Sequence, residues 1–423
     1  MIDHILNARE HRMFDVKKAL DQSPLVLLIK ANIPGDNKNL WVSKYLVLYF
    51  QKLMKHTCEN EDTFYYESMD GPYVIMHLSD DDPEIIKRCL MHIEETHPLG
   101  RFIDLDLFHQ KEHSISRGNM NAPLRTCFLC KEPAIECMRH HRHSTSEMIQ
   151  YIESHVKDYI LSDMRKQMDI AIMSELDLED KFGLVTKTSS GSHQDMDYAL
   201  MTKAKDAILD DLVEIFKLGL ESDSLIDLFI QAKEKGIQAE THMLAATHNI
   251  NCYKGLITVL GFASVSSGYA LSHNQSFDDI FENIKDLSKN ILNDFEKPSH
   301  TFGIKAYKEY QFMGIRGEIS QGLPTVKHIL RDYDRLDIHD SKTLRKALKD
   351  IILLSDDSVF LKRSGSLNNY ETIKQNLSTL DMDNLDEIKK FTESMIQKNI
   401  SFGGSADLLI TVIYLQNIKH LFH

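Results

Sequence analysis

Two aspartates, Asp104 and Asp106, lie two residues apart in the short apolar segment Arg101–Phe108. The alternation of this segment predicts a β-strand, in which side chains two apart point to the same face. Adjacent carboxylates repel each other unless a cation lies between them, and Mg²⁺ favours carboxylate oxygens together with substrate phosphates. The pair therefore predicts a metal platform for phosphoryl or nucleotidyl transfer. Alone, so short a pattern fits the acidic face of a half-exposed edge strand better, but nearby arginines would neutralise a polyphosphate: Arg101, Arg117 and Arg125.

A dense group of cysteines and histidines follows this segment. Cys127 and Cys130 form a C-x-x-C pair, and Cys137 and His143 come shortly after it. Thiolate and imidazole are the ligands of closed, tetrahedral Zn²⁺ sites. The separation of Cys130 and Cys137 is shorter than in familiar zinc fingers, so a set of reduced thiols under a His-rich loop is the alternative interpretation.

A third group of candidates lies in the segment Glu240–Gly255. If this segment is one helix, Glu240 and Lys254 fall on the same narrow stripe at about 100° per residue. The residues that follow, Leu256–Leu271, carry no formal charge. An acid and a lysine on one face of an otherwise apolar helix should be paired or should face a polar pocket. A plain solvent-facing stripe is the alternative.

Two glycine-rich passages add further candidates. Gly403, Gly404 and Ser405 precede an apolar helical run, and backbone N–H groups at a helix start suit an anion. The alternative is an ordinary helix start with Ser405 as its N-cap and Asp407 in the first turn. The earlier passage, between glycines 314 and 322, holds two more candidates, Arg316 and Glu318.

The pattern of elements changes along the chain. Up to about residue 125, strands are predicted at Pro24–Ile33, on both sides of the turn Met69–Pro72, and at Arg101–Phe108, with a helix at Pro83–Thr96. From Ser144 onward helical patterns predominate: Ser146–Met173, Lys203–Leu218, Glu240–Leu271, Phe277–Phe295, Ser341–Leu354, Leu385–Ile396 and Leu408–Ile418. The sequence therefore predicts an α+β domain with a mixed sheet over residues 1–148 and a larger all-α domain over residues 149–423.

Composition limits the function classes. The formal net charge of the 423 residues is -14, which disfavours general binding to nucleic acid or to an anionic membrane. The opening residues lack an apolar export signal, and the longest weakly polar run, Gly255–Leu271, suits a buried core helix better than a membrane span. Six cysteines in so long a chain do not form a disulfide scaffold. We expect a cytoplasmic protein that binds neither nucleic acid nor membrane.

Taken in their order, the motifs resemble those of two known families. The first part resembles the apo-citrate-lyase phosphoribosyl-dephospho-CoA transferase family, through Asn7–Glu10, Asn32–Gly35, His97–Asp106, Ser116–Arg117 and the group Cys127, Cys130, Cys137 and His143. The second part is similar to the triphosphoribosyl-dephospho-CoA synthase family, through Gly183–Val185, Gly191–Met196, Glu240–Gly255, Gly314–Glu318 and Gly403–Leu409. The order, transferase and then synthase, is that of the known fused bifunctional protein.

This resemblance implies a nucleotidyltransferase-like first domain and two consecutive reactions. The synthase domain would join ATP to 3′-dephospho-CoA and release adenine, giving 2′-(5″-triphosphoribosyl)-3′-dephospho-CoA. The transferase domain would then pass the phosphoribosyl-dephospho-CoA group to a serine of the apo acyl carrier (γ) subunit of citrate lyase and release diphosphate.

The roles of individual residues follow from the resemblance and from the expected chemistry. An oxocarbenium-like transition state calls for carboxylates, and the candidates are Glu240, Asp195 and Glu318. Candidates for binding the triphosphate are Lys254, Arg316 and the turn Gly403, Gly404 and Ser405. Mg²⁺ is expected at Asp104 and Asp106, with a second candidate site at Asp357 and Asp407. Zn²⁺ is the candidate metal for Cys127, Cys130, Cys137 and His143.

The sequence departs from the synthase pattern in three places, one of which is Asp357–Val359, where the family has an Asp-Thr-Asn segment. Asp180 and Phe182 stand where the family has prolines on either side of its lysine, and Asn249 and Tyr253 replace a glycine and a histidine. Three alternatives therefore stay open: the same chemistry for a malonate decarboxylase carrier, an active transferase joined to a degenerate synthase, and a non-catalytic, zinc-linked adaptor.

Overall fold

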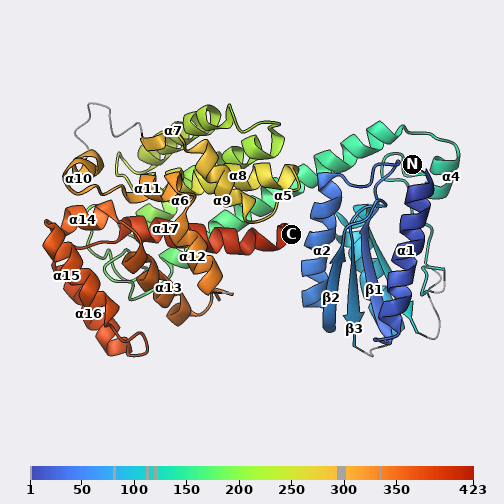
Figure 1. Cartoon of the computed structure of the whole chain (residues 1–423), viewed down its shortest axis with the longest axis horizontal. Coiled ribbons are helices and arrows are strands. Elements are labelled where there is room, and N and C mark those ends of the chain that lie inside the picture. Colours follow the sequence, from blue (N-terminus) through green and yellow to red (C-terminus); the bar gives the residue numbers. More distant parts are fainter. Residues whose placement is uncertain are drawn as a thin grey trace. The chain divides into compact units, whose positions relative to one another are not determined.

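The computed structural model of the chain describes residues 2–79, 82–110, 114–118, 120, 122–292, 302–333 and 335–423. The chain divides into two compact units (Figure 1), Met1–Ile160 with His420–Phe422, and Leu161–Lys419 with His423. The division falls inside helix α5 (Thr145–Leu176), which also contains the boundary expected at residue 148. An α+β first unit followed by a larger helical unit confirms the predicted fold class.

The first unit is built on a four-stranded sheet with the strand order β2-β3-β1-β4. The strands are β1 (Leu25–Ala31), β2 (Asn60–Tyr66), β3 (Tyr73–Leu78) and β4 (Ile103–His109). All the neighbouring pairs are antiparallel, so the expected mixture of strand directions is wrong. The reason is the connectivity: helical crossovers join β1 to β2 and β3 to β4, and one antiparallel strand separates the two members of each of these parallel pairs.

Helices cover the sheet, and the hydrophobic core lies between the helices and the sheet. The helices are α1 (Ile2–Leu20), α2 (Trp41–Thr57) and α3 (Pro83–Thr96), and a short α4 (Ala134–Arg139) follows β4. Val16 and Ala19 of α1 pack with Val26, Leu28 and Ile75 in one buried cluster. The central strand β1 is buried on both of its faces, because helices lie on either side of it (Figure 1).

The edge strand β4 carries Asp104 and Asp106, and α3 holds it in place. Lys87 Nζ donates to the carbonyl of Leu105 at 3.0 Å, and the N–H of Leu105 donates to Glu94 Oε1 at 2.9 Å. Side chains of the helix therefore satisfy the backbone N–H and carbonyl of Leu105 on this edge. As predicted, α3 begins at a proline, and its N-cap Asp82 accepts from the N–H of Glu84.

The second unit contains the end of α5 and a series of further helices. They are α6 (Tyr198–Glu221), α7 (Leu228–Ala246), α8 (Lys254–Ser272), α9 (Asp279–Leu287), α10 (Phe302–Tyr310), α11 (Gly314–Ser320), α12 (Pro324–Asp332), α13 (Ser341–Leu354), α14 (Ser358–Ser364), α15 (Leu367–Ser378), α16 (Leu385–Gln397) and α17 (Gly403–Ile418). No strand occurs in this unit among the residues that the structure describes.

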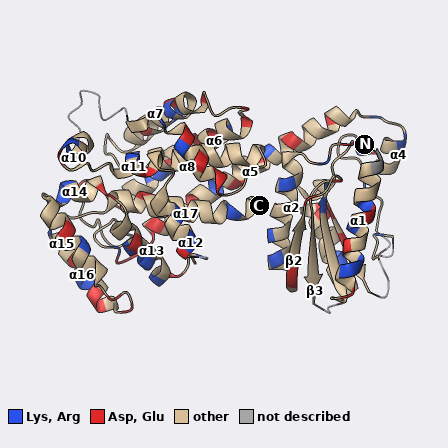
Figure 2. Ribbon diagram, viewed as in Figure 1, with Lys and Arg blue, Asp and Glu red and all other residues tan. Residues whose placement is uncertain are grey.

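Two apolar helices, α8 and α17, form the core of this unit. Charged residues of both signs are spread over the surrounding helices, whereas α17 carries a single charge, Asp407 (Figure 2). Among the described helices, α8 alone is long and apolar enough to cross a membrane, with a mean hydropathy of 1.4, but 72% of that window is buried in the structure. This burial agrees with the core helix predicted from the sequence.

The segment Glu240–Leu271 was expected to form one helix, but it forms two. α7 ends at Ala246, His248 and Asn249 take left-handed φ values of 55° and 67°, and α8 begins at Lys254. A left-handed pair ends an α-helix, so the single helical stripe predicted through Glu240 and Lys254 is wrong. The two residues meet nevertheless, because the short connection returns the chain to the end of α7.

Two other helix bounds differ from the prediction. The helix expected at Phe277–Phe295 ends at Leu287, and residues 293–295 lie outside the described residues. α17 begins at Gly403, with Phe402 as its N-cap, so Ser405 is inside the first turn rather than at the cap. The N–H and Oγ of Ser405 both donate to Asp357. A side chain from another segment thus accepts from the start of this helix, where a local N-cap residue was expected to do so.

Candidate functional site

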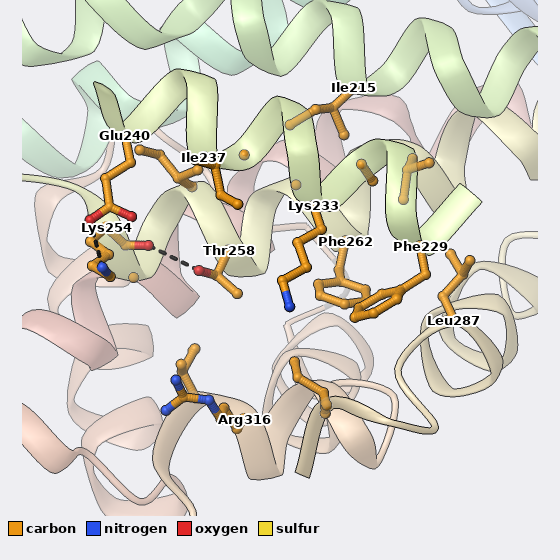
Figure 3. Close-up of a pocket in the computed structure, with 18 residues that line it drawn as sticks. Ile215, Phe229, Lys233, Ile237, Glu240, Lys254, Thr258, Phe262, Leu287 and Arg316 are labelled. Carbon is orange, nitrogen blue, oxygen red and sulfur yellow. Dashed lines mark hydrogen bonds and ion pairs between the residues drawn. The ribbon is translucent and has the colours of Figure 1, made fainter. Parts of the chain in front are cut away.

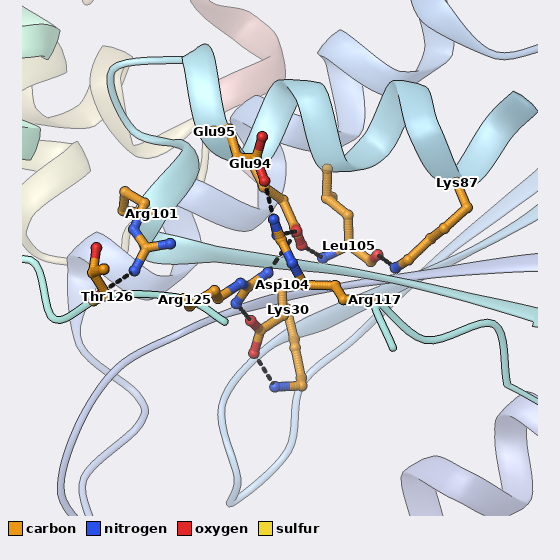
Figure 4. Close-up of polar contacts among 10 residues, drawn as sticks. All are labelled: Lys30, Lys87, Glu94, Glu95, Arg101, Asp104, Leu105, Arg117, Arg125 and Thr126. Carbon is orange, nitrogen blue, oxygen red and sulfur yellow. Dashed lines mark hydrogen bonds and ion pairs between the residues drawn. The ribbon is translucent and has the colours of Figure 1, made fainter. Parts of the chain in front are cut away.

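In the first unit, Asp104 and Asp106 lie on the same face of β4, as predicted, and both are half-buried. Asp104 stands directly opposite Lys30 of β1. Lys30 Nζ lies 2.6 Å from Oδ2 of Asp104, and Arg125 Nη1 lies 2.7 Å from Oδ1 (Figure 4). Burial alone would raise the pKa of Asp104, but these two cations hold it below its ordinary value. Asp104 is therefore ionised, with a cation on each oxygen.

Asp106 has a different environment. It forms no hydrogen bond or ion pair with any other residue that the structure describes. Burial, and then the negative charge of Asp104, raise its pKa above the ordinary value. A cation held between the two carboxylates would remove this penalty, and a pair of carboxylates is a donor set that suits Mg²⁺. The residues present thus fit the expected metal.

Of the three predicted arginines, Arg125 forms an ion pair with Asp104, and Arg125 and Arg117 both pair with glutamates of α3. Arg125 Nη2 lies 2.6 Å from the buried carboxylate of Glu94, and Arg117 Nη1 lies 3.2 Å from the same group. Arg101 donates to the carbonyl of Thr126 (Figure 4). This network attaches the segment after β4 to α3, and Arg125 links it to Asp104.

Sequence reasoning missed a basic cavity beside these aspartates. A cavity of about 380 Å³ is lined by Arg9 and Arg12 of α1, Lys30 at the end of β1, and Lys38 in the loop that follows, with Asp70 as its acid. Arg9 and Arg12 are three residues apart and so share a helix face. That spacing could have identified them, but Lys30 and Lys38 join them only through the sheet and its connections.

The cysteine–histidine group is assembled as a metal site. One donor atom from each of Cys127, Cys130, Cys137 and His143 lies within 4.8 Å of all the others. The Sγ atom of Cys137 is 3.5 Å from that of Cys127 and 3.8 Å from that of Cys130. Nε2 of His143 is buried and has no hydrogen-bond partner among the described residues. Three thiols and an imidazole that converge in this way are compatible with Zn²⁺.

Local structure places these ligands. The N–H of Cys127 donates to the carbonyl of Glu132 at 2.6 Å, which closes the loop that carries the first two cysteines, and α4 supplies Cys137. His143 comes just before a capping box at the start of α5, in which Ser144 and Glu147 accept from each other's N–H groups. The group therefore joins the segment of Arg125 to the start of a long helix.

In the second unit, a pocket of about 450 Å³ lies between α7, α8 and α11. Figure 3 shows Lys254 and Arg316 toward one end of the pocket and the aromatic side chains of Phe229 and Phe262 toward the other, with Lys233 between them. The rest of the lining is largely aliphatic. A pocket with a charged side and an apolar side suits a nucleotide that carries phosphates.

Glu240 and Lys254 meet at the mouth of this pocket. Lys254 Nζ lies 2.5 Å from Glu240 Oε1, and the N–H of Lys254 donates to Oδ1 of Asn251 at 3.1 Å. Lys254 is the first residue of α8, and its ammonium pairs with Glu240 near the end of α7. Three predicted residues, Glu240, Lys254 and Arg316, are thus brought to one pocket.

Lys233 is a cation that sequence reasoning missed. Its Nζ lies 5.8 Å from the ring centroid of Phe229, and it has no carboxylate partner among the described residues. It precedes Glu240 by seven positions on α7, so the two share a helix face. That spacing was visible in the sequence, but only the pocket shows that the face is not simply solvated.

Asp357 and Asp407 lie at the start of α17. Asp357 is buried and accepts from the N–H groups of Val359, Phe360 and Ser405 and from Ser405 Oγ at 2.8–3.0 Å. The carboxylate of Asp407 lies against the start of α8, where a Cβ atom on Gly255 would collide with it. Burial, and then Asp357 and Glu175, raise the pKa of Asp407 well above its ordinary value. The turn of Gly403, Gly404 and Ser405 is therefore tied to an acidic cluster.

The remaining predicted acids do not line the pocket of Figure 3. Glu318 is buried and accepts from the N–H of Thr325 at 3.2 Å and from its hydroxyl at 2.6 Å, and burial raises its pKa. Asp195 is exposed, lines a separate surface depression, and lies 4.0 Å from Nδ1 of His193. Of the predicted carboxylates, Glu240 is therefore the one that lines this pocket.

Comparisons with known proteins cover the whole chain. A family model described as apo-citrate lyase phosphoribosyl-dephospho-CoA transferase matches residues 1–159, and one described as ATP:dephospho-CoA triphosphoribosyl transferase matches residues 162–423. Protein CitXG of Haemophilus influenzae is 24% identical over 99% of this chain and 96% of its own length. Protein CitXG of Leuconostoc mesenteroides is 25% identical over 98% and 96%. A 2-(5''-triphosphoribosyl)-3'-dephosphocoenzyme-A synthase of Haemophilus ducreyi is 27% identical over 69% of this chain and 100% of its own.

Proposed function

Because the chain belongs to the ATP:dephospho-CoA triphosphoribosyl transferase family and carries an apo-citrate lyase phosphoribosyl-dephospho-CoA transferase domain before it, we propose that it is a bifunctional transferase that makes and attaches one prosthetic group. The second domain joins ATP to 3′-dephospho-CoA and releases adenine. The first domain transfers the phosphoribosyl-dephospho-CoA group to a carrier serine and releases diphosphate. The observation that carries the proposal is the pocket that unites Glu240, Lys254 and Arg316 in the domain matched to the synthase.

In the synthase reaction, the 2′-hydroxyl of dephospho-CoA attacks C1 of the ribose of ATP while the bond to adenine breaks. Glu240, as a carboxylate, is the proposed general base that accepts the hydroxyl proton and stabilises the positive charge on the ribose. Lys254, Arg316 and Lys233 bind the triphosphate on the charged side of the pocket. The aromatic side, with Phe229 and Phe262, excludes water from the reacting bond.

The other predicted acids of this domain have supporting roles in the proposal. Asp407, beside the start of α8, is the proposed Mg²⁺ ligand, and Asp357 holds the first turn of α17 in place next to it. Mg²⁺ would neutralise phosphate charge there. Asp195 and Glu318 remain candidates for acid–base work, and Gly403, Gly404 and Ser405 for phosphate contacts.

In the transfer reaction, the hydroxyl of the carrier serine attacks the phosphorus next to ribose, and the bond from that phosphorus to diphosphate breaks. Asp104 and Asp106 are the proposed ligands of Mg²⁺, which would neutralise charge at the transferred phosphoryl group. Lys30 and Arg125 fix Asp104 in its ionised form. The proposed partner is the γ subunit of citrate lyase, in the cytoplasm, with the equivalent carrier of malonate decarboxylase as the alternative.

The first experiment incubates the purified chain with ATP, Mg²⁺ and dephospho-CoA and follows free adenine by chromatography. Apo-carrier is then added, and its mass and the released diphosphate are measured. Citrate lyase and malonate decarboxylase carriers are compared in parallel. The proposal predicts adenine in the first step and a heavier carrier in the second.

Each partial result has a distinct meaning. Carrier loading only when the finished triphosphoribosyl precursor is supplied would show a degenerate synthase, with the changes at Tyr253 and beside Lys181 as its cause. Failure of both steps by a folded protein that holds zinc would favour the non-catalytic adaptor and would overturn the proposal.

A further inference from the structure

The basic cavity of the first unit has a charge balance that a folded protein seldom maintains without a ligand. Four cations line it, namely Arg9, Arg12, Lys30 and Lys38, against the single acid Asp70. The whole chain has the opposite balance, with a net charge of -14. Like charges gathered in one cavity cost free energy unless an anion neutralises them.

The carboxylates nearby satisfy only part of this charge. Arg9 Nε lies 3.2 Å and Arg12 Nη1 lies 2.5 Å from the oxygens of Asp70, so one acid serves two guanidinium groups. Arg12 is buried, with 8% of its surface exposed, and its Nε has no hydrogen-bond partner among the described residues. A buried guanidinium that shares one carboxylate with a second guanidinium leaves positive charge in the cavity, which favours an anion there.

Lys38, unlike the other three cations of the cavity, has no carboxylate partner among the described residues. Its ammonium donates to the carbonyl of Ile33. Burial lowers the pKa of Lys38, and the positive charges of Arg9 and Lys30 lower it further. The negative charge of Asp70 opposes this shift. A polyanion in the cavity would contact Lys38, Arg9 and Arg12 together.

The cavity adjoins the proposed metal platform. Lys30, which lines it, also binds Asp104 of β4. An anion in the cavity would therefore extend away from a phosphoryl group held at Asp104 and Asp106, and Lys30 would stand between the two. This is the relation that the transfer reaction requires between the transferred phosphorus and the diphosphate that leaves it.

We propose that this cavity is the leaving-group subsite of the transferase domain, where Arg9, Arg12, Lys30 and Lys38 bind the terminal diphosphate of the triphosphoribosyl substrate. The inference rests on the proposed function. As the serine oxygen bonds to the phosphorus next to ribose, the bond to the bridging oxygen breaks and its electron pair leaves with diphosphate. The serine proton passes to a base or to water. The four cations stabilise the charge that accumulates on diphosphate.

Dephospho-CoA carries a diphosphate too, inside its chain, and the same cations would recognise it. A terminal diphosphate has more negative charge than an internal one, and four cations match it better. The test must separate these two sources. Inorganic diphosphate stands for the leaving group, and dephospho-CoA for the internal diphosphate.

The experiment titrates the full chain with inorganic diphosphate and separately with dephospho-CoA by calorimetry, with and without Mg²⁺. Lys38→Met and Arg9→Gln should each weaken diphosphate binding about tenfold, as expected for the loss of one charge-assisted contact. Lys18→Met, an exposed lysine at the end of α1, and Arg88→Gln, an exposed arginine on α3, are the matched controls and should change it less than twofold.

Further comparisons separate the alternatives. Lys254→Met, which alters the phosphate side of the synthase pocket, should leave this diphosphate binding in place. Equal binding of diphosphate by wild type, Lys38→Met and Arg9→Gln would overturn the proposal. A parallel loss of dephospho-CoA binding in both variants would assign the cavity to the internal diphosphate instead. The absence of carrier loading by wild type would count against the proposed function, whereas diphosphate binding is read without any carrier.

Discussion

Glu240 and Lys254 form an ion pair in the lining of the proposed synthase pocket. Their ion pair at 2.5 Å holds the side chain of Glu240 beside the start of α8. Glu240 is partly exposed, so a substrate can reach it. A residue in this position can take a proton from a hydroxyl that binds over the helix start.

Glu240→Gln should therefore lower the rate of adenine release at least a hundredfold, because general acid–base catalysis is typically worth that much. Glutamine keeps the size of the side chain and removes its charge. Adenine release is measured by chromatography at saturating ATP and dephospho-CoA. Glu234→Gln, an exposed acid on the same helix, is the control. A Glu240→Gln rate within threefold of wild type would exclude Glu240 as the base.

At the residue scale, the sequence predicted the common face of Asp104 and Asp106 because a period of two is a local property of a strand. It could not predict that Lys30 would stand opposite Asp104, since strand register is set by long-range pairing. The basic cavity was missed for the same reason. Arg9, Lys38 and Asp70 come from a helix, a loop and a hairpin that only the tertiary fold brings together.

His193 connects two segments of the second unit. Its Nε2 lies 3.1 Å from Ser401 Oγ, and Arg363 Nη2 lies 3.1 Å from its Nδ1. Burial, and then Arg363, lower the pKa of His193 to about 4. The folded state therefore keeps this imidazole neutral at a pH where the unfolded chain protonates it.

Because the unfolded state binds more protons between about pH 6.5 and pH 4, His193 makes the fold lose stability as the pH falls through that window. The loss approaches about 3 kcal/mol at the lower end, at 1.4 kcal/mol for each pH unit. His193→Gln should remove this part of the acid sensitivity. Denaturant unfolding of both proteins from pH 7 to pH 4 measures it. A constant difference between the two curves would contradict the assignment.

We expect the cysteine–histidine group to position Arg125 rather than to contact the substrate. It joins the segment of Arg125 to α5, and Arg125 contacts both Glu94 and Asp104. A metal here would fix Arg125 without touching the substrate. Its loss should affect transfer and not adenine release.

Purified protein should hold one zinc per chain by elemental analysis, and Cys137→Ser should hold none. The variant should load carrier at least tenfold more slowly from the finished precursor, because Arg125 is no longer fixed. Its adenine release should stay within twofold of wild type. Cys89→Ser, an exposed cysteine outside the group, is the control. Full carrier loading without zinc would show that the group does not support the site.

At the element scale, the helix break before α8 shows where a pattern alone fails. An uninterrupted helical period predicted one helix, but His248 and Asn249 are left-handed and end it. Asparagine tolerates this conformation better than most residues, which suits it to a position where the related pattern has glycine. Asp180 and Phe182 have positive φ values of 53° and 58°, which proline cannot adopt. The loop around the buried Lys181 therefore differs in backbone from one with prolines there.

The two compact units and the two matched families divide the chain at nearly the same place, within α5. Each candidate site is built from residues of one unit: Asp104 and the basic cavity in the first, and the pocket of Glu240 in the second. The proposed machinery for the two chemical steps therefore shares no residue. The order of the fold classes was readable from the sequence because strand and helix periods differ over long stretches.

Separate machinery predicts that the two activities can be lost one at a time. Asp104→Asn should abolish carrier loading while adenine release stays within twofold of wild type, because the synthase pocket is lined by none of the first unit's described residues. Glu240→Gln should do the reverse and load carrier when given the finished precursor. Mixing the two variants with ATP, dephospho-CoA and apo-carrier should restore loading if the precursor passes through solution, and mass spectrometry of the carrier follows it. A loss of adenine release in Asp104→Asn would contradict the separation. Inactivity of the mixture, with each variant retaining its own step, would instead require that the precursor stay on the chain that made it.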